Sequence, residues 1–178
     1  MKVIDKVSNI DWLYKTIKGY LNINECFLDF CKYKQKHTKT LKMLLEYGAD
    51  IHYKNDQAIK RTCHNHNPDI VKFLVENGAC VTINENEPLL TAIQSHVNIN
   101  EIGDKLQTIM VLLDNGANIY DRNFELLLEV RRHIKNNAIL NYLESVVDKT
   151  IMKKVFANGH FDRSLKSEYN YQSLPNYK

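Results

Sequence analysis

The sequence is poor in the residues that build long loops and disulfide frameworks. Its 178 residues include only 6 glycines, 3 prolines and 4 cysteines. So little Gly and Pro predicts short connections between elements. The cysteines, Cys26, Cys31, Cys63 and Cys80, show no C-x-x-C spacing. We therefore expect free thiols in a reducing compartment rather than disulfides.

The sequence also lacks any long apolar segment. Uncharged apolar runs such as residues 110–113 are far shorter than the roughly 20 residues that a membrane-spanning helix needs. The charged segment 1–6 is not the start of a signal peptide. We expect an intracellular, cytoplasmic protein that does not use a membrane as its partner.

Strong charge of one sign is missing as well. The formal net charge is +3, and no dense basic block is present, so binding to nucleic acid is not favoured. The contents of 44% hydrophobic and 25% charged residues are typical of a folded globular chain.

What the sequence does contain is an internal repeat. Residues 44–51, 74–81 and 112–119 align without gaps as two aliphatic residues, an acid, any residue, Gly-Ala, any residue, and Ile or Val. Each Gly follows an amphipathic run, such as residues 70–75, where a helix needs a left-handed residue at its end. The pattern predicts a helix that stops at Gly48, Gly78 and Gly116 and is followed by a turn.

A second, shorter helix is expected upstream of two of these segments. Pro88 opens the run 88–93 at a position that suits the first turn of a helix. In the preceding unit Asp56 is predicted to be the N-cap of residues 56–63, with Ile59, Thr62 and Cys63 facing inward. Each unit therefore contains a turn, a helix, a turn and a helix.

These residues resemble the ankyrin repeat family. The T-P-L-H-x-A motif that opens a first helix is matched at Pro88, Leu89 and Ala92, and residues 41–50 and 70–80 match the second helix. The resemblance covers about residues 7–147 and implies an all-α solenoid of helix-turn-helix repeats. The glycines are unevenly spaced, which indicates shortened finger turns and an enlarged loop at residues 97–104. The sequence is in this respect similar to the ankyrin proteins of giant DNA viruses such as mimivirus.

The repeat divides the chain into three parts. Residues 1–24 are expected to form a capping helix or degenerate repeat, and residues 148–178 a basic helix with a polar tail. The array itself is predicted over residues 25–147, in units of 25–51, 52–81, 82–119 and 120–147. We expect a monomer.

Sites for metals, cofactors and catalysis are not expected. Cys63, His64, His66 and Cys80 are chemically able to bind zinc, but they lack the paired spacing of structural zinc sites. His66 also falls where the repeat usually has Gly between its helices. No nucleophile elbow or phosphate-binding Gly loop occurs, so we predict that the protein is not an enzyme.

The resemblance implies a binding face formed by the finger turns and the exposed sides of the first helices. Tyr and Arg are frequent interface anchors, and clustered basic residues favour a protein partner with an acidic surface. The predicted partner-binding residues are Tyr53, Lys54, Arg61, His64, Tyr120, Arg122 and Arg132. Each of them is equally compatible with an ordinary solvated residue.

Two other functions remain open at this stage. A nucleic-acid-associated protein would use the basic residues of the tail, which are Lys149, Lys153, Lys154, Arg163 and Lys166. A ubiquitin-ligase adaptor would need an F-box-like segment, for which residues 173–175 are a very short match.

Overall fold

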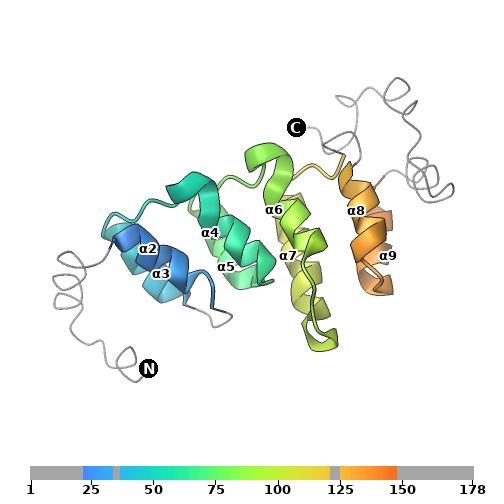
Figure 1. Cartoon of the computed structure of the whole chain (residues 1–178), viewed down its shortest axis with the longest axis horizontal. Helices are drawn as coiled ribbons and strands as arrows, with labels where there is room; N and C mark the ends of the chain where they lie inside the picture. The colour runs from blue at the N-terminus through green and yellow to red at the C-terminus, as the bar shows by residue number, and fades with distance from the viewer. Residues whose placement is uncertain (1–21, 34–36, 121–124, 148–178) are drawn as a thin grey trace.

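A computed structural model describes residues 22–33, 37–120 and 125–147, and these form pairs of antiparallel helices that stand side by side (Figure 1). No strand occurs in these ranges, so the predicted all-α repeat fold is confirmed. The pairs are α2 (Ile23–Phe30) with α3 (Thr38–Glu46), α4 (Tyr53–His64) with α5 (Pro68–Glu76), α6 (Ile83–Gln94) with α7 (Ile102–Asp114), and α8 (Glu125–His133) with α9 (Asn137–Val146).

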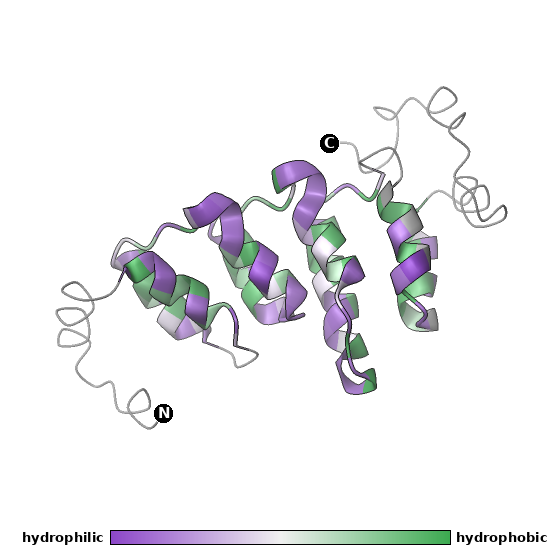
Figure 2. Cartoon of the chain, viewed as in Figure 1, coloured by the Kyte–Doolittle hydropathy of each residue, from purple (hydrophilic) through white to green (hydrophobic). Residues whose placement is uncertain are grey.

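The helices pack in two rows. The first helices of successive units contact one another, α2 with α4, α4 with α6 and α6 with α8, while α3, α5 and α7 form the second row. Their apolar stripes meet in a core that includes the fully buried Phe27, Ile59, Ile70, Leu89 and Ile109. Hydrophilic residues gather instead at the turns that open α4 and α6 (Figure 2). As predicted, the inward-facing Thr62 and Cys63 are buried.

The second helices end at the Gly-Ala pairs because these close a Schellman motif. The N–H of Gly78 donates to the carbonyl of Val75 at 3.0 Å, and the N–H of Ala79 to that of Leu74 at 2.9 Å. The same bonds recur at Gly48 and Gly116, and all three glycines have φ between 91° and 98°. The predicted helix stop is thus confirmed.

Replacing Gly78 by Val should lower the free energy of unfolding by about 1–2 kcal/mol or more, because a β-branched residue resists positive φ. Nothing lies within 4 Å of a Cβ built at Gly78, so the cost comes from the backbone alone. Gly103, inside α7, provides the matched control, because Gly103→Ala should be neutral or stabilise by about 0.5–1 kcal/mol. Equal thermal melts for Gly78→Val and the wild type would contradict this helix ending.

The finger turns lie at the starts of α4 and α6 and are left-handed. Lys54, Asn55 and Asp56 have φ of 53°, 60° and 54°. Asn84, Glu85 and Asn86 repeat this conformation one unit later, with φ of 49°, 56° and 62°. Four of these six residues are Asn or Asp, side chains that tolerate this region better than most. Regular helix geometry begins only after each turn, which places Pro88 in the first turn of its helix as predicted.

The last residue of each left-handed turn closes its own repeat. The Asp56 carboxylate accepts from the N–H of Cys80 at 3.2 Å, and the Asn86 side chain accepts from the N–H of Asn118 at 2.8 Å. Asn24 makes the equivalent bond to the N–H of Asp50 at 2.7 Å. The N-cap role predicted for Asp56 is therefore wrong. Its side chain reaches across the unit to Cys80, as the Asn24 side chain reaches Asp50 without a left-handed backbone. We call these three bonds the repeat clasps.

The third unit is larger than its neighbours, as the glycine spacing predicts. Between α6 and α7 lies a short 3-10 helix, η2 (Ile99–Glu101), and the pair extends beyond the others (Figure 1). Residues 102–104 of the predicted loop belong to α7, which has 13 residues against 9 in α3 and 9 in α5. The insertion therefore lengthens the helix as well as the loop.

Candidate functional site

The row of first helices is joined by polar side chains at its finger end. The Tyr53 hydroxyl donates to the Glu25 carboxylate at 3.1 Å, and the Lys54 ammonium donates to the same oxygen. The hydrogen bond from Lys54, supported by that from Tyr53, lowers the pKa of Glu25. Two predicted interface residues thus connect the first two repeats to each other.

Further pairs continue along the row toward the last repeat. Lys60 on α4 reaches Glu87 on α6 at 3.3 Å, and Gln94 on α6 donates to Glu129 on α8 at 2.8 Å. Arg132 also donates to Glu129, at 2.7 Å. Burial raises the pKa of Glu129, but the hydrogen bonds from Gln94 and Arg132 outweigh burial and hold it below the usual value. These contacts fix the spacing between consecutive first helices.

The predicted partner-binding residues differ widely in their exposure. Lys54, His64 and Arg132 are exposed, whereas Tyr53 and Arg61 are half-buried. The Nη1 atom of Arg61 is buried without a hydrogen-bond partner in the described part of the chain. Arg122 lies outside the described residues.

The prediction that Tyr120 lies on the binding surface is wrong. It aligns with His52 and Thr82, which are exposed, yet only 1% of Tyr120 is accessible to solvent. A buried Tyr ring removes a large apolar area from water, which favours packing over exposure here. Its N–H donates to Asn118 Oδ1 at 2.9 Å, in the same kind of turn that joins His52 to Asp50. Tyr120 is therefore part of the core and is not a surface anchor.

The cysteine and histidine cluster does not assemble into a ligand set. Cys63 and His66 are buried while His64 is exposed, and no three His, Cys, Asp or Glu side chains in the described ranges form a metal-binding group. His66 has φ of 49°, which agrees with the Gly-like position predicted for it. Burial raises the pKa of Cys31 to about 12 and also raises that of Cys63, so both thiols stay protonated and are poor nucleophiles at neutral pH.

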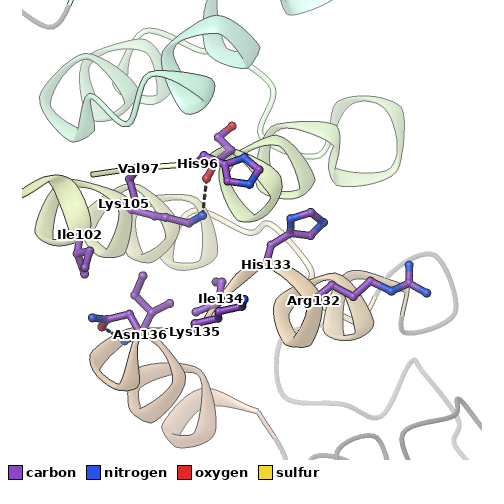
Figure 3. A pocket seen from close by; sticks show the side chains of 11 residues that line it. His96, Val97, Ile102, Lys105, Arg132, His133, Ile134, Lys135 and Asn136 are labelled. Atoms are coloured by element: carbon purple, nitrogen blue, oxygen red, sulfur yellow. Dashed lines mark hydrogen bonds between the residues drawn. The ribbon is translucent and has the colours of Figure 1, made fainter. Parts of the chain in front are cut away.

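A pocket that the sequence did not predict lies between the enlarged third unit and the fourth unit. Lys105 of α7 is 3% exposed and lines this pocket together with His96, His133 and Lys135 (Figure 3). The sequence did not indicate it because a lysine directly after the predicted loop 97–104 is typical of a solvated residue. The only usable signal was that Lys105 falls in the helical register of the buried Thr108, Ile109 and Leu112.

The predicted terminal segments fall largely or wholly outside the described residues. The basic residues 149–166 of the tail and residues 173–175 are among them. No described helix is long and apolar enough to cross a bilayer.

Comparison with known proteins agrees with this architecture. A family model described as ankyrin repeats in three copies matches residues 28–123. A putative ankyrin repeat protein, R598, of Acanthamoeba polyphaga mimivirus is 37% identical over 101 residues. That match covers 56% of this chain, which spans only 28% of the length of the viral protein. No solved structure matches. With its stacked helix pairs, its Gly-Ala helix endings and this family match, the chain belongs to the ankyrin repeat family.

Proposed function

We propose that the protein works without catalysis, as a module that binds another protein through the row of first helices and finger turns. Ankyrin repeats are protein interaction modules, and stacked repeats usually bind through the extended face that the stacking creates. The observation that carries the proposal is the row itself. α2, α4, α6 and α8 are linked across each repeat boundary, which gives a continuous face of fixed spacing.

The charges on this face favour an acidic partner. Lys54 and Lys60 are paired with Glu25 and Glu87, so they contribute little net attraction. The Nη1 atom of Arg61 has no acceptor in the described part of the chain, but it is buried and therefore out of reach of a partner. A partner carboxylate would instead meet the exposed His64 and the accessible part of the half-buried Arg61, where charge-assisted hydrogen bonds are stronger than neutral ones. We place the centre of the binding face at the end of α4.

We further propose that the partner is a host-cell protein, because the similar mimivirus protein comes from a virus of an amoeba. The test is affinity purification of the tagged full chain from Acanthamoeba lysate, with partners quantified by mass spectrometry. The double variant Arg61→Gln/His64→Glu should recover the specific partner about tenfold less, because it loses at least one charge-assisted bond of about 1.5–3 kcal/mol.

A matched control distinguishes a specific effect of the first-helix face from a general effect of the protein's net charge. Lys72 is exposed on α5, in the second row, and Lys72→Glu should leave recovery of the partner unchanged. Thermal melts of every variant exclude unfolding as the cause. Equal loss in Lys72→Glu would refute the proposed face. Recovery that vanishes with nuclease or with moderate salt would instead indicate nucleic acid, whose binding is steeply salt-dependent.

A further inference from the structure

A cavity of roughly 300 Å³ opens between the last two described repeats, at the end of the helices opposite the finger turns. It lies between the α6–α7 connection and the α8–α9 connection (Figure 3). No Asp or Glu is among the described residues that line it. Its apolar lining consists of Val97, Ile102, Ile134 and Ile139, and its basic lining includes His96, Lys105, His133 and Lys135.

Lys105 places a positive charge on the wall of this cavity without a counter-ion. Its Nζ donates to the carbonyls of Ile93 at 2.8 Å and Ser95 at 2.7 Å. An ammonium has three donors, and the third has no acceptor in the described part of the chain. Burial lowers the pKa of Lys105 to about 8, so the group remains largely protonated at neutral pH. A buried charge with no opposite charge beside it is costly, and an anion would offset that cost.

The nearby carboxylate, Glu129, is already engaged. Gln94 and Arg132 donate to it, and His133 Nε2 lies 3.2 Å from its second oxygen. Arg132 also lines the cavity, and its side chain extends away from Lys105 (Figure 3). The His133 ring packs edge-on against His96 with centroids 6.2 Å apart, and the His96 ring is drawn next to the end of the Lys105 side chain (Figure 3). The cavity therefore offers the Lys105 ammonium, which forms no ion pair with Glu129, and the exposed His96 imidazole beside it.

We propose that this cavity binds a single carboxylate carried on a short apolar stem, with Lys105 as its counter-ion and the isoleucine and valine side chains around the stem. A carboxylate fits better than phosphate because one buried ammonium balances one negative charge, while the apolar lining disfavours a dianion. On a protein partner the group would be an acidic side chain or the chain terminus. That last step rests on the proposed function, whereas binding of the small carboxylate does not.

The test is an NMR titration of the full chain with sodium isovalerate at pH 7 and constant ionic strength. Side-chain resonances of His96, His133 and Lys105 should shift together, with saturation in the millimolar range expected for so small a ligand. Neutral isovaleramide, which has the same stem, should shift them at least tenfold more weakly. Equal shifts with the amide, or inorganic phosphate binding as tightly as isovalerate, would overturn the proposal.

Variants locate the binding group. Lys105→Met should weaken isovalerate binding about tenfold or more, because it removes a charge-assisted hydrogen bond. Lys72→Met, on α5, should bind as the wild type does. If Lys105→Met fails to fold, the exposed pair His96→Gln/Lys135→Gln replaces it and should weaken binding several-fold. If the variant that folds binds isovalerate as tightly as the wild type does, the cavity is not the binding site. The titration contains no protein partner, so this outcome would not contradict the proposed binding face on the first helices.

Discussion

Asp56→Leu should lower the free energy of unfolding by about 2–5 kcal/mol, which is a large part of the stability of a small array. Two costs add. Leu strongly disfavours the φ of 54° at this position, which costs about 1–2 kcal/mol. The N–H of Cys80 also loses its acceptor in a partly buried place, which costs about 1–3 kcal/mol. Chemical denaturation followed by circular dichroism measures the sum.

Two control variants separate these costs. Asp56→Asn keeps the acceptor and the tolerance for left-handed backbone, as Asn86 does in the next repeat, so it should cost below about 1 kcal/mol. Asn55→Leu, at an exposed neighbour with φ of 60°, carries the backbone cost alone. Amide exchange at Cys80 should accelerate in Asp56→Leu and not in Asn55→Leu. If Asn55→Leu proved as damaging as Asp56→Leu, the clasp bond would contribute nothing.

The sequence predicts those parts of the fold that local chemistry determines. A Gly-Ala pair after an amphipathic run indicates the Schellman ending at Gly78, and Pro88 indicates the first turn of a helix. Asp56 was misplaced because an N-cap and a repeat clasp require the same short acceptor side chain. Deciding between them requires knowing which backbone N–H lies next to the side chain in the folded unit, and the sequence pattern does not contain this.

The candidate surface was harder to predict because exposure depends on how neighbouring units pack. Alignment places Tyr120 level with the exposed Thr82, yet its ring is buried. Tyr53 and Lys54 are in the predicted region, but their polar groups bind Glu25 across a repeat boundary. Lys105 escaped notice because no motif marks a lysine that satisfies the carbonyls of Ile93 and Ser95.

Lys105 should make the stability of the protein depend on alkaline pH. Its folded pKa of about 8 lies below the unfolded value near 10.4. Below pH 8 both states bind the proton, and the cost of burying the charge is fully present. Between about pH 8 and 10.4 the unfolded state holds more protons, so the free energy of unfolding rises with pH. One pKa unit between the folded and unfolded states corresponds to about 1.4 kcal/mol, so Lys105 raises the free energy of unfolding by up to about 3 kcal/mol.

The buried thiols lower the free energy of unfolding as pH rises, which opposes the effect of Lys105. The measurement is therefore the difference in stability between the wild type and a Lys105 variant. Cys31 and Cys63 have raised folded pKa values, and their unfolded thiols ionise near pH 8.5, which lowers stability as pH increases. Urea unfolding of wild type and Lys105→Met from pH 7 to 10.5 cancels this shared loss. The stability of the wild type minus that of the variant should climb by up to about 3 kcal/mol across the range. For Lys72→Met, whose lysine is exposed, the same difference should stay flat. Parallel curves for wild type and Lys105→Met would show that Lys105 is hydrated in solution, and a hydrated ammonium would need no anion in the cavity.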